Sequence, residues 1–268
     1  MHFCKMHGIG NDFIMIDGYD LKEVPDWAKI SKKYCDRHFG IGADGLILIL
    51  PSEKADTRMV VCNSDGSLAQ MCGNGLRCAA VFARDTGRVT KDDMTVETGA
   101  GILRASLSGS TVTCDMGIPE LRPERIPVAG ASNRFFAALG GKEREFFCVS
   151  MGNPHGVTFD VYPEGNEFYD WGARMEHDPR FPEKANIEFC RVRDGGIDVR
   201  VWERGDGETL ACGTGASAVL VAAASQGLIG READIRLPGG TLRIRWAENG
   251  HVFMTGPAEK VFEGEFQL

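Results

Sequence analysis

Two glycine-rich segments of this chain match each other, and this internal repeat restricts the possible folds more than any other feature of the sequence. The first is Gln70-Met-Cys72-Gly-Asn-Gly75 and the second is Leu210-Ala-Cys212-Gly-Thr-Gly215, with the two cysteines 140 residues apart. Each segment follows a strand-like run that ends in a turn of glycine and aspartate. In both places the pattern predicts a strand, a turn and then a helix that begins beside the cysteine.

Further residues upstream repeat in the same order and at nearly the same spacing from the two cysteines. The spacings differ by at most two residues, and the pairs are Asn11 with Asn153, Gly45 with Asn186, and Asn63 with Glu203. A single Cys-Gly-x-Gly segment is weak evidence, but four matched features in one order make chance improbable. We therefore expect two homologous halves in a chain of 268 residues, a length at which one hydrophobic core stops growing.

The fold class expected is α/β, with two pseudo-twofold halves that each wrap a mainly antiparallel sheet around a central helix. The halves are predicted at residues 1–117, joined by a returning C-terminal strand at 260–268, and at 118–259. We expect the active site in the cleft between them. The runs that carry this expectation are the strand-like Phe13–Asp17, Leu46–Leu50, Arg58–Cys62, Val199–Glu203, Thr241–Trp246 and His251–Thr255, and the helical Pro25–His38, Asn74–Thr86 and Ala216–Gln226.

Composition excludes several classes of protein. The net charge is −8 and no basic stripe stands out, which argues against nucleic-acid binding. The long uncharged stretch Ala211–Gly230 contains too many polar residues and glycines for a membrane span and is expected to be a buried helix. The start of the chain lacks an export signal, so we expect a cytoplasmic protein. Its nine cysteines contain no Cys-x-x-Cys pair and are expected to be reduced thiols.

A cysteine at a helix start is chemically suited to proton transfer. Backbone N–H groups and the helix dipole stabilise a thiolate there, so we expect lowered pKa values for Cys72 and Cys212. The same N–H groups bind a carboxylate. Two such helix starts, facing each other, would grip one carboxylate and place a sulfur on each face of the adjoining α-carbon. This arrangement predicts racemisation or epimerisation, in which one thiolate removes the α-proton and the opposite thiol returns one.

At these residues the sequence resembles diaminopimelate epimerases, and the resemblance runs nearly the whole chain. Its carriers include Lys5-Met-His-Gly-Ile-Gly-Asn-Asp-Phe13, Gly40-Ile-Gly-Ala-Asp44, Asn63-Ser-Asp-Gly66, Ser150-Met-Gly-Asn-Pro-His155, Glu203-Arg-Gly-Asp-Gly-Glu208 and Leu237-Pro-Gly-Gly240, beside the two cysteine segments. The resemblance implies interconversion of L,L- and meso-diaminopimelate without pyridoxal phosphate, other cofactor or metal. It also implies a homodimer and a place in the synthesis of lysine and cell-wall precursors.

The resemblance also assigns site residues, position by position. Cys72 and Cys212 match the catalytic cysteines, His155 and Glu203 match groups that tune them, and the substrate-binding positions are Asn11, Asn63, Gly73, Asn74, Asn153, Asn186, Glu203, Arg204, Gly213 and Thr214. One position departs from the pattern. Some family members carry Gln where this chain has Gly45, so a side-chain contact with substrate is in doubt there.

Other interpretations remain open. Asparagine beside glycine or proline often serves only to form a turn, and Arg204 could be a solvated charge at a strand end. His7 and His155 lack partners at metal-ligand spacing, so a zinc site is disfavoured. A proline or hydroxyproline racemase is the nearest rival within the class, although such enzymes tend to carry His where Asn74 stands. A non-catalytic amino-acid-binding protein of the same fold is the rival from another class, and the presence of both cysteines argues against it.

Overall fold

The computed structural model of the protein describes residues 1–21 and 25–267. The chain divides into two compact units. The first unit consists of Met1–Asp115 together with Thr255–Leu268, and the second is Met116–Met254. The segment that returns to the first unit therefore begins at Thr255, rather than at the expected residue 260.

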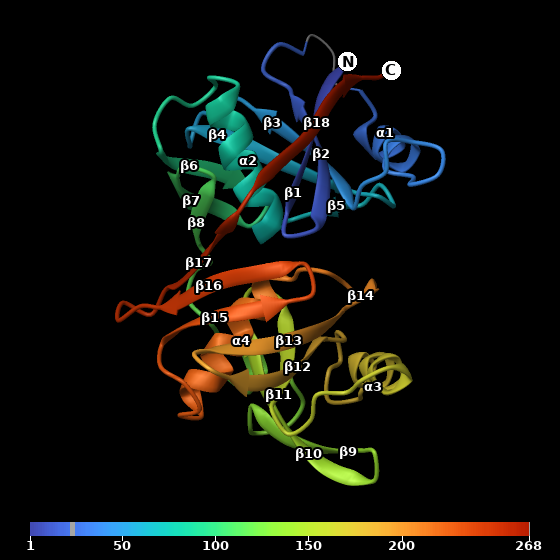
Figure 1. Ribbon diagram of the computed structural model, residues 1–268, viewed down its shortest axis with the longest axis vertical. Coiled ribbons are helices and arrows are strands. Elements are labelled where there is room, and N and C mark those ends of the chain that lie inside the picture. The colour runs from blue at the N-terminus through green and yellow to red at the C-terminus, as the bar shows by residue number, and fades with distance from the viewer. Residues whose placement is uncertain (22–24, 268) are drawn as a thin grey trace. The chain divides into compact units, whose positions relative to one another are not determined.

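The first unit is built from a mixed sheet that is mainly antiparallel (Figure 1). Antiparallel pairs join β1 to β2, β3 to β4, β4 to β5, β6 to β7 and β7 to β8, whereas β2–β3 and β4–β6 are parallel. Its elements are β1 (His2–Gly8), β2 (Asn11–Asp17), α1 (Trp27–Tyr34), β3 (Gly45–Leu50), β4 (Thr57–Asn63), β5 (Leu68–Ala69), α2 (Gly73–Asp85), β6 (Asp93–Thr98), β7 (Gly101–Ser108) and β8 (Thr111–Asp115).

Helix α2 is the central element of the first unit. Ten residues in succession, Asn74 to Ala83, are buried, because strands β1–β4 and β6–β8 contact the helix. One of these buried residues is Arg77, whose Nε donates to the carbonyl of Pro257 at 3.1 Å. A helix buried on every side is expected at the centre of a unit rather than on its surface.

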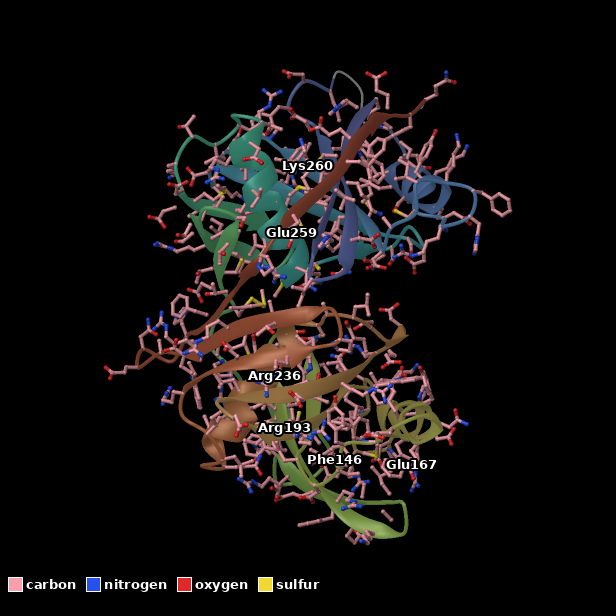
Figure 2. The ribbon with its side chains drawn as sticks, viewed as in Figure 1. Phe146, Glu167, Arg193, Arg236, Glu259 and Lys260 are labelled. Atoms are coloured by element: carbon pink, nitrogen blue, oxygen red, sulfur yellow. The ribbon has the colours of Figure 1, made fainter. Side chains whose placement is uncertain are left out.

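The last strand of the chain completes the first unit. Strand β18 (Glu259–Glu265) pairs antiparallel with β1, from His2 opposite Glu265 to His7 opposite Glu259. In Figure 1 it is the red strand that ends near the N-terminus, and Figure 2 labels Glu259 and Lys260 along it. Backbone hydrogen bonds between Met1 and Phe266 fasten the two ends of the chain together.

The second unit contains the remaining elements and a core rich in aromatic side chains. Phe146, labelled in Figure 2, stacks on Phe135 and meets Phe189 edge to face. The elements are η1 (Pro123–Arg125), β9 (Arg134–Leu139), β10 (Lys142–Ser150), β11 (Pro154–Thr158), α3 (Asn166–Glu176), β12 (Asn186–Arg193), β13 (Gly196–Glu203), β14 (Gly207–Glu208), α4 (Gly213–Ser225), β15 (Glu232–Leu237), β16 (Gly240–Trp246) and β17 (Val252–Pro257), the last of which continues into the first unit.

The two units share one strand topology. In the second unit β10–β11, β12–β13, β13–β14 and β15–β16 are antiparallel and β11–β12 and β13–β15 are parallel, which repeats the pattern from β1 to β7. Helix α4 occupies the central place that α2 has in the first unit, and strands β10–β12, β15 and β16 contact it. The predicted fold class, two related α/β halves with mainly antiparallel sheets around a central helix, is confirmed.

Strand register identifies which residues are equivalent in the two units. Phe13 pairs with Gly45 in the first unit and His155 pairs with Asn186 in the second, so Phe13 corresponds to His155. One and two residues further along, Leu46 and Ile47 correspond to Ile187 and Glu188. The repeat seen in the sequence is therefore also a repeat of strand pairing. The side chains differ at some equivalent positions, and the apolar pair Phe13 and Ile47 of the first unit is replaced by a histidine and a glutamate in the second.

Two helices differ from the sequence-based prediction. Helix α1 covers Trp27–Tyr34 rather than Pro25–His38, because the chain after Cys35 turns back to bond with the helix end. Helix α3 was not predicted. It packs Phe168 and Met175 into the core, and its Gly172 lies directly against the ring of Trp202.

Candidate active site

Both cysteines of the repeat cap the central helix of their unit. Cys72 is the N-cap of α2 and its Sγ accepts a hydrogen bond from the Gly75 amide at 3.3 Å. Cys212 is the N-cap of α4 and accepts from the Gly215 amide, also at 3.3 Å. Sulfur here takes the place that a serine or aspartate oxygen usually fills at a helix start. Each thiol therefore lies beside a first turn whose N–H groups are suited to binding a carboxylate.

In the first unit, Asn11 links the cysteine to the helix start. Its Oδ1 accepts from Sγ of Cys72 at 3.7 Å and from Nδ2 of Asn74 at 3.1 Å. Its own Nδ2 donates to Oδ2 of Asp44 at 2.7 Å. The acceptor at Asp44 fixes which end of the Asn11 amide faces the thiol, so the oxygen is the atom presented to Cys72.

Asp44 belongs to a group of charged side chains behind Asn11. Arg37 bridges Asp44 and Asp12 at 2.7 and 2.8 Å, and Lys5 lies 2.7 Å from Asp12. Burial acts to raise the pKa of Asp12, but hydrogen bonds from Arg37 and Lys5 outweigh it and lower that pKa to about 2. The Asp12 carboxylate is therefore charged at neutral pH, and hydrogen bonds to Asp12 and Asp44 hold the turn that carries Asn11.

In the second unit, a buried histidine and glutamate stand behind the corresponding asparagine. His155 and Glu188 have no exposed surface, and His155 Nδ1 lies 2.6 Å from Glu188 Oε1. The other ring nitrogen, Nε2, lies 3.0 Å from Oδ1 of Asn153. Nδ2 of Asn153 donates to the Thr214 hydroxyl at 3.4 Å, and that hydroxyl lies 3.5 Å from Sγ of Cys212. A continuous series of polar contacts thus ends at the sulfur of Cys212, and its members are Glu188, His155, Asn153 and Thr214.

Glu203 is the second carboxylate near Cys212. Burial raises the pKa of Glu203 from its ordinary value of 4.5 to about 7, although a hydrogen bond from the Thr209 hydroxyl acts in the opposite direction. A carboxyl group with such a pKa exchanges a proton near neutral pH. Displaced values of this kind are common at catalytic sites.

The expectation of a lowered thiol pKa is wrong for Cys212. Burial raises the pKa of Cys212 well above its ordinary value of 9.0, and the nearby carboxylates of Glu203 and Glu188 add to the rise. The hydrogen bonds from Thr214 and the Gly215 amide lower it, but by less. The helix-start argument considers only the dipole, whereas desolvation of a thiolate in a fully buried site is the larger effect. Cys212 is therefore a thiol at neutral pH.

Asn186 and Arg204 form a second cluster in the same unit. Nδ2 of Asn186 donates to the carbonyl of Pro154 at 3.0 Å, and its Oδ1 accepts from the Arg204 amide at 2.9 Å. The Arg204 side chain is exposed and donates from Nη1 to the carbonyl of Glu183 at 3.0 Å. The structure therefore places the substrate-binding candidates Asn186 and Arg204 together, at the end of the strand that carries Glu203.

Two positions of the first unit that the sequence analysis considered for substrate binding, Asn63 and Gly45, have more limited roles in the structure than expected. Asn63 uses its amide in a turn, where Nδ2 donates to the Ser67 hydroxyl at 3.0 Å. Gly45 has no room for a side chain, because a Cβ there would lie 2.8 Å from the carbonyl oxygen of Cys62. Gly45 can therefore offer only its backbone.

Three residues that the sequence analysis did not select hold site side chains in place. They are Asp44, Glu188 and Thr209, which bond to Asn11, His155 and Glu203 respectively. Glu188 gave no signal in the sequence, because a glutamate in a strand-like run can face either solvent or the core, and its burial appears only in the structure. Thr209 gave none either, because a hydroxyl is ordinary in a polar segment, whereas Asp44 stands at the end of the Gly40-Ile-Gly-Ala-Asp44 motif that carries the family resemblance.

Among the described residues, no group of three or more histidine, cysteine or acidic side chains is arranged to hold a metal ion. In the same part of the chain, no helix combines the length and apolar character that a membrane span needs.

The fold, two related α/β units that each wrap around a central helix, defines a class of two-unit α/β proteins. A solved structure described as a probable proline racemase, from Agrobacterium radiobacter, has this fold with a TM-score of 0.72 and 15% identity, and the alignment covers 100% of this chain and 93% of that one. A family model described as diaminopimelate epimerase matches residues 3–121 and 147–261. The chain belongs to the diaminopimelate epimerase family.

Curated relatives with that name match over almost their full length. The diaminopimelate epimerase of Acetivibrio thermocellus is 49% identical, covering 100% of this chain and 99% of the relative. The one from Desulfitobacterium hafniense is 47% identical, covering 98% of this chain and 97% of the relative. The resemblance expected from the sequence motifs is thereby confirmed.

Proposed function

We propose that the protein is an isomerase that interconverts L,L-diaminopimelate and meso-diaminopimelate, using Cys72 and Cys212 as its acid and base. The observation that carries the proposal is the duplicated cap, in which each central helix begins with a cysteine whose sulfur accepts from the amide three residues on. Membership of the family and the names of the full-length relatives support the substrate.

The mechanism requires both sulfurs to reach one α-carbon of the bound substrate, from opposite faces. One thiolate removes the α-proton, and the other thiol delivers its own proton to the opposite face, so the configuration inverts. In the reverse direction the roles exchange. Cys212 is suited to begin as the donor, because burial keeps its thiol protonated.

The amides at the two helix starts supply the second part of catalysis. A positioned acid or base accelerates a reaction typically ~10²–10⁴-fold, which is too little for so weak a carbon acid. Negative charge that spreads into the carboxylate during deprotonation meets the amides of Gly73 and Asn74 and of Gly213 and Thr214. Hydrogen-bond donors that are fixed in advance around developing charge commonly lower the reaction barrier more than any other single effect.

The experiment that tests the proposal is turnover in heavy water. The purified protein is incubated with L,L-diaminopimelate, and samples are taken during the first turnovers. The isomers are then separated, and mass spectrometry measures the deuterium content of each. We expect deuterium at the inverted carbon of the product and almost none in unreacted substrate, because the donor thiol exchanges with solvent. Product that keeps the substrate's own hydrogen would falsify the two-base mechanism.

Single replacements complete this test. Cys72→Ala and Cys212→Ala should each abolish epimerisation, since either the acid or the base is missing in both directions. Cys190→Ala is the matched control, because Cys190 is a buried thiol on β12 that caps no helix. Epimerisation at a comparable rate in either of the first two variants contradicts the proposal.

The same assay separates the rival functions. A proline or hydroxyproline racemase would invert those amino acids and leave diaminopimelate unchanged, and the likeness to the proline racemase structure concerns the fold alone. A binding protein would retain diaminopimelate without exchanging its α-hydrogen. We expect inversion of diaminopimelate and none of proline.

We further propose that the enzyme works as a cytoplasmic homodimer in the route to lysine and cell-wall precursors. The support is that the chain belongs to the diaminopimelate epimerase family, since the family resemblance implies these properties. Light scattering during size-exclusion chromatography measures the assembly directly. A mass of one chain, 29.2 kDa, at working concentration would contradict the dimer without affecting the proposed reaction.

A further inference from the structure

Glu176, the last residue of α3, is a buried acid that the proposed reaction does not use. The residue is 4% exposed, and both oxygens of its carboxyl group accept hydrogen bonds. Oε2 accepts from the indole Nε1 of Trp202 at 2.8 Å, and Oε1 accepts from the amide of Gly205 at 3.1 Å. These bonds replace the contacts with water that the carboxyl group loses on burial.

The two donors stand on either side of two candidate site residues. Trp202 immediately precedes Glu203 on β13. Gly205 immediately follows Arg204 in the turn between β13 and β14, and its φ of +90° marks the point where the chain changes direction. Glu176 therefore holds both ends of the short segment that carries Glu203 and Arg204.

Glu176 carries a negative charge at neutral pH. Burial acts to raise the pKa of this carboxyl group, but hydrogen bonds from Trp202 and from the Gly205 amide outweigh it, and the pKa lies below its ordinary value. Neither donor can be reversed, because an indole N–H and a backbone N–H only donate. The position therefore needs two acceptor oxygens, and a carboxylate supplies both.

Other residues that follow α3 also hold Arg204. The Arg204 amide donates to Oδ1 of Asn186 at 2.9 Å, and its Nη1 donates to the carbonyl of Glu183 at 3.0 Å. Helix α3 itself contacts β13 and β14, the two strands that the turn joins (Figure 1). An exposed arginine otherwise samples many side-chain conformations. The chain from 176 to 186 thus restrains both the backbone and the guanidinium of Arg204.

The first unit supports the corresponding strand end from the corresponding helix. Helix α1 lies between β2 and β3 in the chain, as α3 lies between β11 and β12. Its buried Ser31 donates to the carbonyls of Cys62 and Asn63 at 3.1 Å and 2.8 Å, and Asn63 is the residue that corresponds to Glu203. Support of this strand end by a helix side chain is therefore common to both units.

We propose that Glu176 is a positioning residue that holds Arg204 in place to bind the distal carboxylate of diaminopimelate. The planar guanidinium of Arg204 is suited to a carboxylate. Because Glu176 orders the turn before the substrate arrives, binding does not bear the entropic cost of ordering it. The inference rests on the proposed function, since Arg204 can act in this way only on a substrate with a carboxylate at its far end.

The first test measures the two hydrogen bonds without substrate. Glutamine has nearly the size of glutamate but offers one oxygen and one NH2 group, so in Glu176→Gln at least one donor loses its acceptor. Nuclear magnetic resonance of ¹⁵N-labelled protein follows the indole hydrogen of Trp202 and the amide hydrogen of Gly205. We expect one of them to exchange with solvent at least about tenfold faster in the variant. Wild-type exchange rates for both hydrogens overturn the proposal.

The second test is the kinetics of diaminopimelate epimerisation. We expect Glu176→Gln to raise KM about tenfold and to change kcat less than about threefold, because the lost contact weakens binding without moving the cysteines. In an Arg204→Met background, the same change should alter kcat/KM less than about threefold, because the side chain that Glu176 positions is missing.

Glu167→Gln is the matched control for the kinetics. Glu167, labelled in Figure 2, is an exposed glutamate in the first turn of the same helix. Its replacement removes the same charge from α3 and should leave KM and kcat unchanged. A tenfold rise in KM in this control would mean that the charge of the helix, and not the position of Glu176, controls binding, and would overturn the proposal.

A fall in kcat with unchanged KM contradicts the proposal, as do equal losses in the wild-type and Arg204→Met backgrounds, since Glu176 would then act without Arg204. If Glu176→Gln does not fold, Glu176→Asp takes its place in both tests, because its shorter side chain keeps the charge and does not span both donors. Failure of the proposed function is distinguishable, because wild-type protein then leaves diaminopimelate unchanged. Failure of this inference alone leaves the wild type active.

Discussion

The raised pKa of Glu203 predicts a specific dependence of stability on pH. In the unfolded chain this carboxyl group ionises near 4.5, and in the folded protein it ionises near 7 because it is buried. Between these values the folded protein binds the extra proton, so its free energy of unfolding falls as the pH rises. The penalty is absent below pH 4.5 and is fully present above pH 7.

The size of the penalty follows from the same two values. A tenfold change in proton affinity is worth about 1.4 kcal/mol, and the interval from 4.5 to about 7 corresponds to about 3 kcal/mol. Glu203 keeps some contact with solvent, which weakens the effect, so about 2 to 3 kcal/mol is expected. Glutamine at this position can still accept from Thr209 and carries no charge at any pH.

The assay is urea unfolding of the wild type and Glu203→Gln at pH 5, 6, 7 and 8. We expect the two proteins to differ little at pH 5, and the variant to gain about 2 to 3 kcal/mol over the wild type by pH 8. Glu248→Gln is the control, because Glu248 is exposed on a turn and its replacement should leave the pH profile unchanged. A difference between Glu203→Gln and wild type that stays constant from pH 5 to 8 would refute the reasoning.

Two further predictions concern packing and recognition. Gly215→Ala should lower the free energy of unfolding by about 1 to 2 kcal/mol, although alanine usually favours a helix, because its Cβ would lie 2.7 Å from Glu188 Oε1. Gly230→Ala, which meets nothing within 4 Å, should change it by less than about 0.5 kcal/mol in the same urea titration. Arg204→Met should lower kcat/KM for diaminopimelate at least about tenfold, the worth of about 1.4 kcal/mol, and near-native kinetics would remove Arg204 from the site.

The repeat in the sequence was enough to predict the fold class and the two helix starts. Glycine beside cysteine, a preceding turn and a run of apolar residues are local signals, and local signals decide where a helix begins. Helix α3 lacked such signals. Its Gly165 cap forms no side-chain hydrogen bond and Gly172 interrupts the pattern, so packing against Trp202, which a sequence does not display, stabilises the helix.

The sequence predicted the position of the site better than it predicted the chemistry of the site. The pKa of Cys212 was expected to fall, because the helix start is visible in the sequence and the depth of burial is not. Glu188 is the clearest example of the same difficulty. A single glutamate in a strand gives no sign of whether it faces solvent or the core, and here the strand register turns it toward His155.

The pairing of β18 with β1 reverses the order in which the two units can be finished during synthesis on the ribosome. Proteins with two domains usually complete the N-terminal domain first. Here the second unit is one continuous segment, Met116–Met254, whereas the first needs residues from Thr255 onward. The edge of β1 that β18 covers stays open until those residues leave the exit tunnel. Exposed strand edges promote misassociation. We therefore expect chaperone binding to matter most while the first unit is still incomplete on the ribosome.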